Sequence, residues 1–262
     1  MKTVLFDMDG TLTPARSKIE RKVINTLKKL SIAANIGIVT GSDLDYLLEQ
    51  CSELFEIGGV GPDKVRLFPC NGTKEYTWNC NKWQLVSNAD MIQKVGDECY
   101  RGLLKQLVEK QMHLLDTEGG VKYTGTFFQY RGSMLNWCPI GRSASSFERG
   151  LWEAADLNNR IRLPILNSLK SWVEKNKYEI CIALGGGTSF DIYPTGWDKT
   201  YVFNHVDVEN CYFVGDKCEG VGNDRQIYEK AKASGLGAFS VKNPDETLDV
   251  VIEKIIPQLG ES

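Results

Sequence analysis

Histidine is scarce in this sequence, and its cysteines are not spaced like metal ligands. The 262 residues include only two histidines, His113 and His205, and none of the eight cysteines forms a CxxC pair. A structural zinc site needs several closely spaced ligands of these two types, so none is expected. The cysteines are scattered and no secretory segment precedes them, which favours reduced thiols in a cytoplasmic protein over disulfides.

The chain also lacks a strong excess of charge and any long apolar run. Its formal net charge is −3, which gives no sign of electrostatic capture of nucleic acid. No stretch approaches the roughly 18 apolar residues of a membrane span. Residues 1–3 lead directly into a short apolar run and leave no room for a targeting segment. We therefore expect a cytoplasmic globular protein that binds neither nucleic acid nor membranes.

Both ends of the chain alternate short apolar runs with amphipathic stretches. The length of 262 residues and the 42% apolar content suit one large core or two modest ones. The patterns predict strands at residues 3–7, 36–40, 211–216 and 238–241, and helices at 19–31, 44–54, 224–234 and from 243 onward. Strands and helices in this order favour an α/β fold, with a parallel sheet that binds ligands at the carboxyl ends of its strands.

The middle of the chain has a different pattern. A hairpin is expected between about 60 and 85, and helices at 90–112 and 149–176 are combined with strand-like stretches at 122–138, 178–184 and 189–193. Such a mixture indicates a separate α+β unit. We therefore predict a core formed by residues 1–83 and 194–262, with a cap domain, residues 84–193, inserted between its halves.

Two carboxylates stand at the end of the first predicted strand. Residues 7–13 read Asp-Met-Asp-Gly-Thr-Leu-Thr and directly follow an apolar run. In an extended chain Asp7 and Asp9 would point the same way, and two like charges held so close call for a cation or a shared proton. An ordinary Asx turn is the alternative, since Asp and Gly are common turn residues. The strand context favours a metal-assisted carboxylate site.

Other polar residues follow the remaining predicted strands. Asp216 ends the strand 211–216, Ser42 follows the strand 36–40, and Lys199 and Asp224 stand near helix starts. Phosphoryl transfer needs a nucleophile such as Asp7, a hydroxyl such as Ser42 and a cation such as Lys199. Mg²⁺ prefers oxygen ligands, for which Asp7, the backbone carbonyl of Asp9, Asp216 and Asp224 are candidates. Alternatively, Ser42 and Asp224 are helix N-caps and Lys199 is a surface residue.

These segments resemble the haloacid-dehalogenase-like phosphotransferases, in which the first Asp is phosphorylated and the second is an acid/base. Over nearly the whole chain the resemblance is to the eukaryotic-type α-phosphomannomutases. Its motifs are residues 7–13 with Arg16, Gly41-Ser42-Asp43, Gly125-Thr126-Phe127, Met134-Leu135-Asn136, residues 139–143, Glu148-Arg149, Ser189-Phe190-Asp191, residues 196–199, Gly215-Asp216-Lys217 and Gly222-Asn223-Asp224. The resemblance implies a Rossmann-like core with an inserted cap.

The resemblance also implies the substrate and the residues that bind it. In the cap, Arg131, Arg142 and Arg149 are expected to bind a phosphate group, although solvated surface charges are the alternative. Arg16 would reach the substrate from the core, and Ser189 and Asp191 would bind sugar hydroxyls. The chain departs from the family pattern at Cys70, Thr124 and Trp137. The bulky Trp137 is close in sequence to the arginines, so this departure bears on sugar preference.

The implied reaction interconverts mannose 6-phosphate and mannose 1-phosphate. Asp7 would carry the phosphoryl group, Asp9 would move the proton, and Mg²⁺ with a mannose or glucose 1,6-bisphosphate activator would be required. The product would supply GDP-mannose synthesis, and the enzyme would be a homodimer joined through its caps. A sugar-phosphate phosphatase of the same superfamily is the alternative, and a silent sugar-phosphate-binding protein is a third hypothesis.

Overall fold

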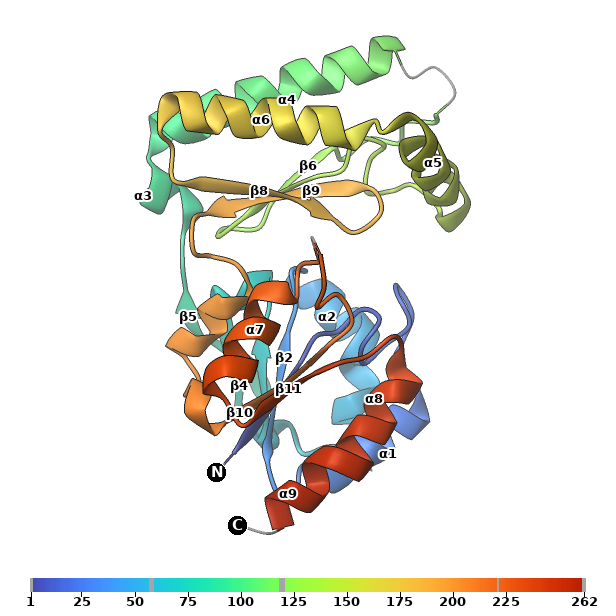
Figure 1. Cartoon of the computed structure of the whole chain (residues 1–262), viewed down its shortest axis with the longest axis vertical. Coiled ribbons are helices and arrows are strands. Elements are labelled where there is room, and N and C mark those ends of the chain that lie inside the picture. The colour runs from blue at the N-terminus through green and yellow to red at the C-terminus, as the bar shows by residue number, and fades with distance from the viewer. Residues whose placement is uncertain (1, 57–58, 118–120, 221, 261–262) are drawn as a thin grey trace. The chain divides into compact units, whose positions relative to one another are not determined.

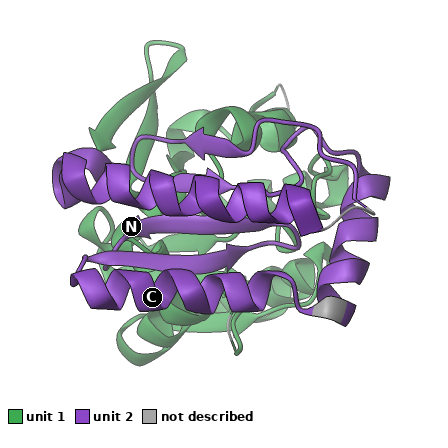
Figure 2. Cartoon of the chain, turned by 90° about the horizontal axis from the view of Figure 1, so that it is seen from above, with its two compact units in different colours: residues 1–88, 196–262 green, residues 89–195 purple. Residues whose placement is uncertain are grey.

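The computed structural model describes residues 2–56, 59–117, 121–220 and 222–260, which form two compact units (Figure 1). The core unit contains Met1–Asn88 and Gly196–Ser262, and the cap unit contains Ala89–Thr195 (Figure 2). The boundary expected at residue 84 falls inside β5 (Lys82–Asn88), which pairs with β4 (Lys74–Asn79) and so belongs to the core. The boundary expected at 193 falls inside the last strand of the cap.

A seven-stranded sheet forms the centre of the core unit, with the order β11-β10-β1-β2-β3-β4-β5. Its parallel strands are β1 (Thr3–Phe6), β2 (Asn35–Val39), β3 (Val65–Phe68), β10 (Cys211–Gly215) and β11 (Gly237–Ser240). The hairpin β4–β5 adds an antiparallel edge. This confirms the predicted parallel α/β fold.

Apolar side chains on both faces of the sheet explain its helical cover. Val4 and Phe6 of β1 pack into one hydrophobic cluster, and Leu5 packs into the other, because successive strand residues point to opposite faces. The first cluster is covered by α1 (Arg21–Leu30), α2 (Leu44–Cys51), α8 (Pro244–Val250), a π-helical turn (Val251–Ile255) and α9 (Ile256–Gly260). The second is covered by α7 (Arg225–Ser234) and the 3₁₀ helix η4 (Lys199–Asn204). Further 3₁₀ turns span Ser52–Phe55, Pro62–Lys64, Cys70–Gly72 and Val208–Asn210.

The cap unit is a four-stranded antiparallel sheet with the order β6-β7-β9-β8. The strands are β6 (Phe128–Tyr130), β7 (Leu135–Trp137), β8 (Ile180–Gly185) and β9 (Ser189–Pro194), and the helices are α3 (Met91–Val95), α4 (Asp97–Thr117), α5 (Ser146–Asn159) and α6 (Arg162–Asn176). Helices α4 and α6 lie side by side over one face of this sheet (Figure 2).

The cap elements are shorter than the sequence pattern predicts. The mostly helical stretch 149–176 is two helices: Arg160 takes a left-handed conformation with a φ of 52° that ends α5, and α6 begins at Arg162, close to Pro164, where a helix start was expected. Similarly, Gly96 with a φ of 85° separates α3 from α4. Periodicity alone did not show the break at Gly96.

Trp137 belongs to the packed interior of the cap. Its ring is fully buried and stacks on Phe190 at 4.7 Å, and its Nε1 donates to Gln111 Oε1 of α4 at 2.8 Å. Because neighbouring residues of a strand face opposite ways, Asn136 points to the other face. Trp137 is therefore close to the arginine motifs in sequence, whereas its side chain packs toward the helices.

Within the described ranges, none of the helices combines the length and the apolar character that crossing a membrane requires.

Candidate active site

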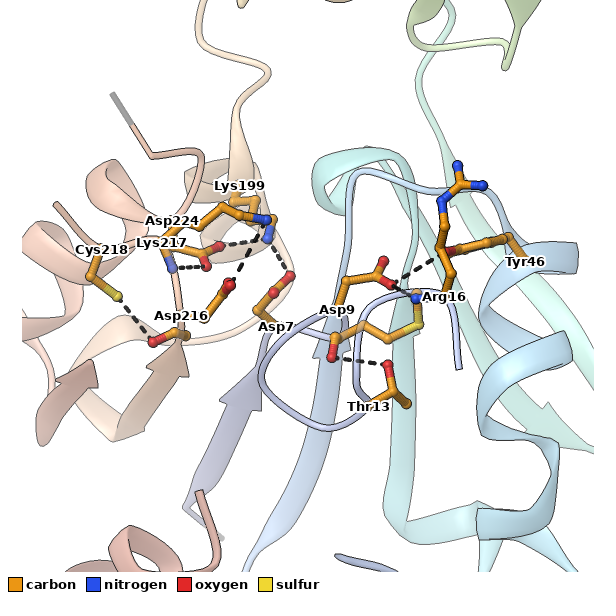
Figure 3. Close-up of polar contacts among 12 residues, drawn as sticks. Asp7, Asp9, Thr13, Arg16, Tyr46, Lys199, Asp216, Lys217, Cys218 and Asp224 are labelled. Carbon is orange, nitrogen blue, oxygen red and sulfur yellow. Dashed lines mark hydrogen bonds and ion pairs between the residues drawn. The ribbon is translucent and has the colours of Figure 1, made fainter. Parts of the chain in front are cut away.

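Asp7 stands at the carboxyl edge of the core sheet, directly after β1. Its backbone N–H donates to Val214 O of β10 at 2.9 Å, which continues the ladder by one residue, and its side chain is buried. The carboxylate points toward the loop after β10 and toward η4 (Figure 3). There it accepts a hydrogen bond from Lys199 Nζ.

Asp9 does not share this environment. Its Oδ1 accepts hydrogen bonds from Tyr46 Oη at 3.2 Å and from the backbone N–H of Arg16 at 3.1 Å, on the other side of the loop (Figure 3). The expectation that Asp7 and Asp9 point the same way was wrong. β1 ends at Phe6, and the chain bends at Met8, whose carbonyl oxygen accepts the backbone N–H groups of Leu12 and Thr13, so the strand period no longer applies.

Lys199 is the centre of a buried ion-pair network. It is 1% exposed, begins η4, and pairs with Asp7 and, at 2.5 Å, with Asp224 Oδ1. The alternative of a surface lysine was therefore wrong. Asp224 is fully buried at the start of α7, but its side chain makes no capping hydrogen bond to that helix. Instead its Oδ2 accepts the backbone N–H of Lys217 at 3.1 Å.

Asp216 completes a group of three carboxylates. Asp7, Asp216 and Asp224 each offer an oxygen, and these oxygens all lie within 4.8 Å of one another. Asp216 Oδ1 is buried and has no hydrogen-bond partner among the described residues. Gly10 permits this approach, because a Cβ at that position would lie 2.8 Å from Asp216 Cγ.

The three carboxylates outnumber their two cationic neighbours, the buried Lys199 and the half-exposed Lys217, whose Nζ lies 3.8 Å from Asp216 Oδ2. Burial, reinforced by the charges of Asp224 and Asp216, raises the pKa of Asp7 to about 8 even though Lys199 opposes the shift. Burial also raises the pKa of Asp216. A divalent cation would relieve this excess of negative charge, and oxygen donors are the ligands that Mg²⁺ prefers. The orphaned Oδ1 of Asp216 and the converging carboxylates thus fit such an ion, whereas the carboxylate of Asp9 is not part of this group.

Two roles were considered for Ser42 in the loop after β2: the N-cap of α2, and a hydroxyl that binds a phosphoryl oxygen. Asp43 is the N-cap of α2, where it accepts the backbone N–H of Tyr46 at 3.1 Å. Ser42 is not the cap, and no hydrogen bond of its hydroxyl is found in the described part of the chain. Because β2 neighbours β1, Ser42 is at the same sheet edge as Asp7, where a hydroxyl can bind a phosphoryl oxygen.

Tyr46 is a site residue that the sequence pattern did not indicate. Burial and the negative charge of Asp9 raise the pKa of Tyr46 to about 12, so its hydroxyl remains a donor at neutral pH. Its position in the first turns of α2 was visible in the sequence. Its contact with Asp9, which lies 37 positions earlier, depends on how the sheet and α2 pack.

The cap unit brings together several of the predicted substrate-binding residues. Arg142 Nη1 donates to Asn136 Oδ1 at 2.9 Å, and Asn136 Nδ2 donates to Asp191 Oδ1 at 2.7 Å. Arg149 is buried and braces the loop before α5, because its Nη2 donates to Arg142 O at 2.8 Å. Asn136 is a second site residue that was not singled out individually.

The remaining candidates are placed as follows. Arg149 Nη1 also donates to Thr188 Oγ1 at 2.7 Å, beside the buried Ser189 at the start of β9. Arg131 is buried next to β6, and its Nη2 donates to Gln129 Oε1 at 3.2 Å. In the core unit Arg16 has a φ of 59°, and no partner of its guanidinium is found among the described residues. The substrate-binding roles of these residues stay predictions.

Phosphoryl transfer through a carboxylate is catalysed mainly by positioning the reacting groups and by stabilising the charge of the transition state. Such chemistry uses a buried lysine paired with the aspartate that follows the first strand, a group of carboxylates that can bind a cation, and an inserted cap. Fold and site together define a two-unit α/β protein whose carboxylate site is of the kind that phosphoryl transfer requires. The IMP-nucleotidase of Plasmodium falciparum has a similar fold, with a TM-score of 0.66 at 16% identity over 99% of this chain and 67% of that chain.

Comparison with known sequences identifies the family within that class. The family described as "Eukaryotic phosphomannomutase" matches residues 23–257. The phosphomannomutase of Saccharomyces cerevisiae is 35% identical over 95% of this chain and 92% of its own. That of Schizosaccharomyces pombe is 36% identical over 94% and 91%. The chain belongs to the eukaryotic phosphomannomutase family.

Removing one carboxylate should stabilise the metal-free protein. We expect Asp216→Asn to raise the free energy of unfolding in EDTA by about 1 kcal/mol, because a carboxylate is removed that lies close to two others and has only the half-exposed Lys217, at 3.8 Å, as an ion-pair partner. The variant should also lose most of the stabilisation that Mg²⁺ confers by binding the folded state. Chemical unfolding with EDTA or Mg²⁺ measures both effects. Asp249→Asn, which removes an exposed carboxylate of α8, should keep the Mg²⁺ response; a destabilised Asp216→Asn protein that still responds to Mg²⁺ would contradict the assignment.

The raised pKa of Asp7 predicts a pH dependence of stability without metal. Between the ordinary pKa of 3.8 and about 8, folded Asp7 holds a proton that the unfolded chain has released. The folded state therefore binds more protons in this window, and its stability must fall as the pH rises through it. We expect the urea midpoint in EDTA to decrease from about pH 5 to about pH 8, and Asp7→Asn to lose most of that decrease. An equal decrease in the variant would show that another group is responsible.

Proposed function

We propose that this protein is a phosphomannomutase that interconverts mannose 6-phosphate and mannose 1-phosphate. The observation that carries the proposal is that the family match extends through the cap unit while Asp7, Asp9, Lys199 and Asp216 are all present. A phosphatase needs the same core groups, so the sugar-binding cap is what favours a mutase. A silent binding protein would not need a buried lysine paired with the nucleophile.

Asp7 is the proposed phosphoryl carrier. Its carboxylate attacks a phosphoryl group of a hexose 1,6-bisphosphate, an acyl–phosphate bond forms, and the sugar oxygen leaves with a proton from Asp9. Lys199 neutralises charge beside Asp7, and the hydroxyl of Ser42 binds a phosphoryl oxygen. Mg²⁺, held by Asp7, Asp216 and Asp224 together with the backbone carbonyl of Asp9, would supply further positive charge to the phosphoryl oxygens.

The second half of the cycle reverses these roles. Asp9 takes the proton of a hydroxyl on the incoming hexose monophosphate as that oxygen attacks the phosphoryl group on Asp7. The acyl–phosphate bond breaks, a hexose bisphosphate forms, and Asp7 regains its carboxylate. Reorientation of the bisphosphate then allows its other phosphoryl group to return to Asp7, which completes the isomerisation.

The cap arginines are proposed to bind the phosphate group that is not being transferred. Arg142 is held by Asn136, and Arg149 braces the loop on which Arg142 lies. A guanidinium held in a fixed orientation binds a phosphate in bidentate fashion at a smaller entropic cost. Arg131 and Arg16 would contribute further positive charge, while Ser189 and Asp191 would bind sugar hydroxyls.

The cellular setting in the proposal is the cytoplasm, where the product would supply GDP-mannose synthesis. Free cysteines support this setting, since all eight lie in the described ranges and none is in a disulfide. Burial raises the pKa of Cys51, Cys211 and Cys218 to about 12, which makes these thiols unreactive.

One assay tests the proposed reaction against its alternatives. Mannose 1-phosphate with Mg²⁺ should give mannose 6-phosphate only when glucose or mannose 1,6-bisphosphate is added, and free phosphate should be a minor product. Asp7→Asn should lower the rate by at least about a thousandfold, because the nucleophile is lost. Phosphate release without isomerisation would instead identify a phosphatase, and binding without turnover would identify a silent protein.

A homodimer formed through the cap unit is part of the proposal. On α4, Val108, Met112 and Leu115 are 45%, 60% and 45% exposed, and their spacing places them on one face of the helix. Exposed apolar stripes of this kind are typical of protein interfaces.

Charge placed on this stripe should therefore disrupt the dimer. Met112→Glu is expected to weaken self-association at least about tenfold, because an unpaired carboxylate would be buried. Light scattering after size-exclusion chromatography measures the mass of each species. Ser168→Glu adds the same charge to the exposed side of α6 and should leave the mass unchanged. A wild-type protein that is monomeric, or a Met112→Glu protein that is still fully dimeric, would rule this interface out.

A further inference from the structure

The two oxygens of Asp9 have different surroundings. Oδ1 accepts two hydrogen bonds, from Tyr46 Oη at 3.2 Å and from Arg16 N at 3.1 Å. No hydrogen bond to Oδ2 is found within the described residues. In Figure 3 the carboxylate of Asp9 faces Arg16 and Tyr46 on one side of the loop, and Asp7 faces the opposite way toward Lys199.

Both donors to Oδ1 are held by the fold. The ring of Tyr46 is half-buried and packs against the main hydrophobic cluster of the core unit. Its backbone is fixed in the first turns of α2 by the N-cap Asp43. The N–H of Arg16 is aimed by a left-handed backbone conformation, and the turn is closed by a hydrogen bond from Ser17 N to Pro14 O at 3.0 Å. Left-handed conformations are uncommon outside glycine, so this orientation is specific to the loop.

We propose that Tyr46 is a positioning residue for proton transfer, which fixes Oδ1 of Asp9 and leaves Oδ2 as the oxygen that exchanges the proton. This inference rests on the proposed function. In one direction Oδ2 takes the proton of the sugar hydroxyl while the oxygen–phosphorus bond forms and the Asp7–phosphorus bond breaks. In the other direction Oδ2 returns that proton to the leaving sugar oxygen. A carboxylate without the Tyr46 hydrogen bond would rotate and present Oδ2 to the substrate less often.

Two phosphoryl donors separate this role from a general structural one. A hexose bisphosphate expels a sugar alkoxide, which requires a proton from Asp9. p-Nitrophenyl phosphate expels p-nitrophenolate, a stable anion that requires none. Tyr46→Phe should therefore lower kcat for the mutase reaction about tenfold with little change in KM, because a hydrogen bond to a charged group is lost. The pre-steady-state burst of p-nitrophenolate should keep its wild-type rate.

A matched control and a double mutant complete the experiment. Tyr212→Phe removes a hydroxyl of the same unit that donates to Gln258 Oε1 at 2.9 Å, and it should leave both reactions unchanged. In an Asp9→Asn background, Tyr46→Phe should have no further effect on the mutase rate, since coupled residues are not additive. An equal thermal midpoint for Tyr46→Phe and Tyr212→Phe shows that any difference in rate is not a difference in folding.

The outcomes are distinguishable. An unchanged mutase rate in Tyr46→Phe, equal losses in both reactions, or losses that multiply in the double mutant would each overturn the inference. Absence of both the burst and the isomerisation in the wild-type protein would overturn the proposed function instead. The expected result is that Tyr46→Phe slows the mutase reaction but not the burst, and that it has no further effect on the mutase rate in the Asp9→Asn background.

Discussion

The ion pairs of Lys199 with Asp7 and Asp224 organise the rest of this site. All three groups are almost fully buried, where an unpaired charge is very costly, so each depends on the others. They also join three separate segments of the core unit: the end of β1, the start of η4 and the start of α7. One lysine cannot balance Asp7, Asp216 and Asp224 together. The remaining negative charge fits a divalent cation, which would in turn favour the binding of phosphoryl groups.

The loop after β1 separates two carboxylates that stand two positions apart. Asp7 faces the lysine and the other strand-end carboxylates, while Asp9 faces a phenol and a backbone N–H. Two similar groups in unlike environments can take unlike roles, one as nucleophile and one as proton carrier. The bend at Met8 separates the two side chains, and the missing Cβ of Gly10 leaves room for Asp216 beside Asp7.

Much of this arrangement was predictable because it depends on local pattern. Apolar runs in the sequence indicated β1, β2 and β10. Because residues that follow parallel strands meet at one edge of the sheet, Asp7, Ser42 and Asp216 were correctly expected at that edge. Lys199 was assigned to the site from the motifs around it, whereas its burial was not predicted, since an isolated lysine is normally exposed. The orientation of Asp9 and the contact of Tyr46 were missed, because both depend on a turn and on helix packing. In the cap, Trp137 was expected near the arginines, whereas strand alternation turns its ring to the helices and Asn136 to the other face.

In the proposed mechanism Asp7 itself carries the phosphoryl group. Incubating the protein with glucose 1,6-bisphosphate labelled with ³²P, reducing it with borohydride and mapping the peptides tests this claim directly. Reduction converts an aspartyl phosphate to homoserine, and the account predicts homoserine at position 7, with position 9 unchanged. The label should leave the protein when mannose 1-phosphate is added and should appear in a hexose bisphosphate. Homoserine at position 9, or a label on a residue other than Asp7, would contradict the account.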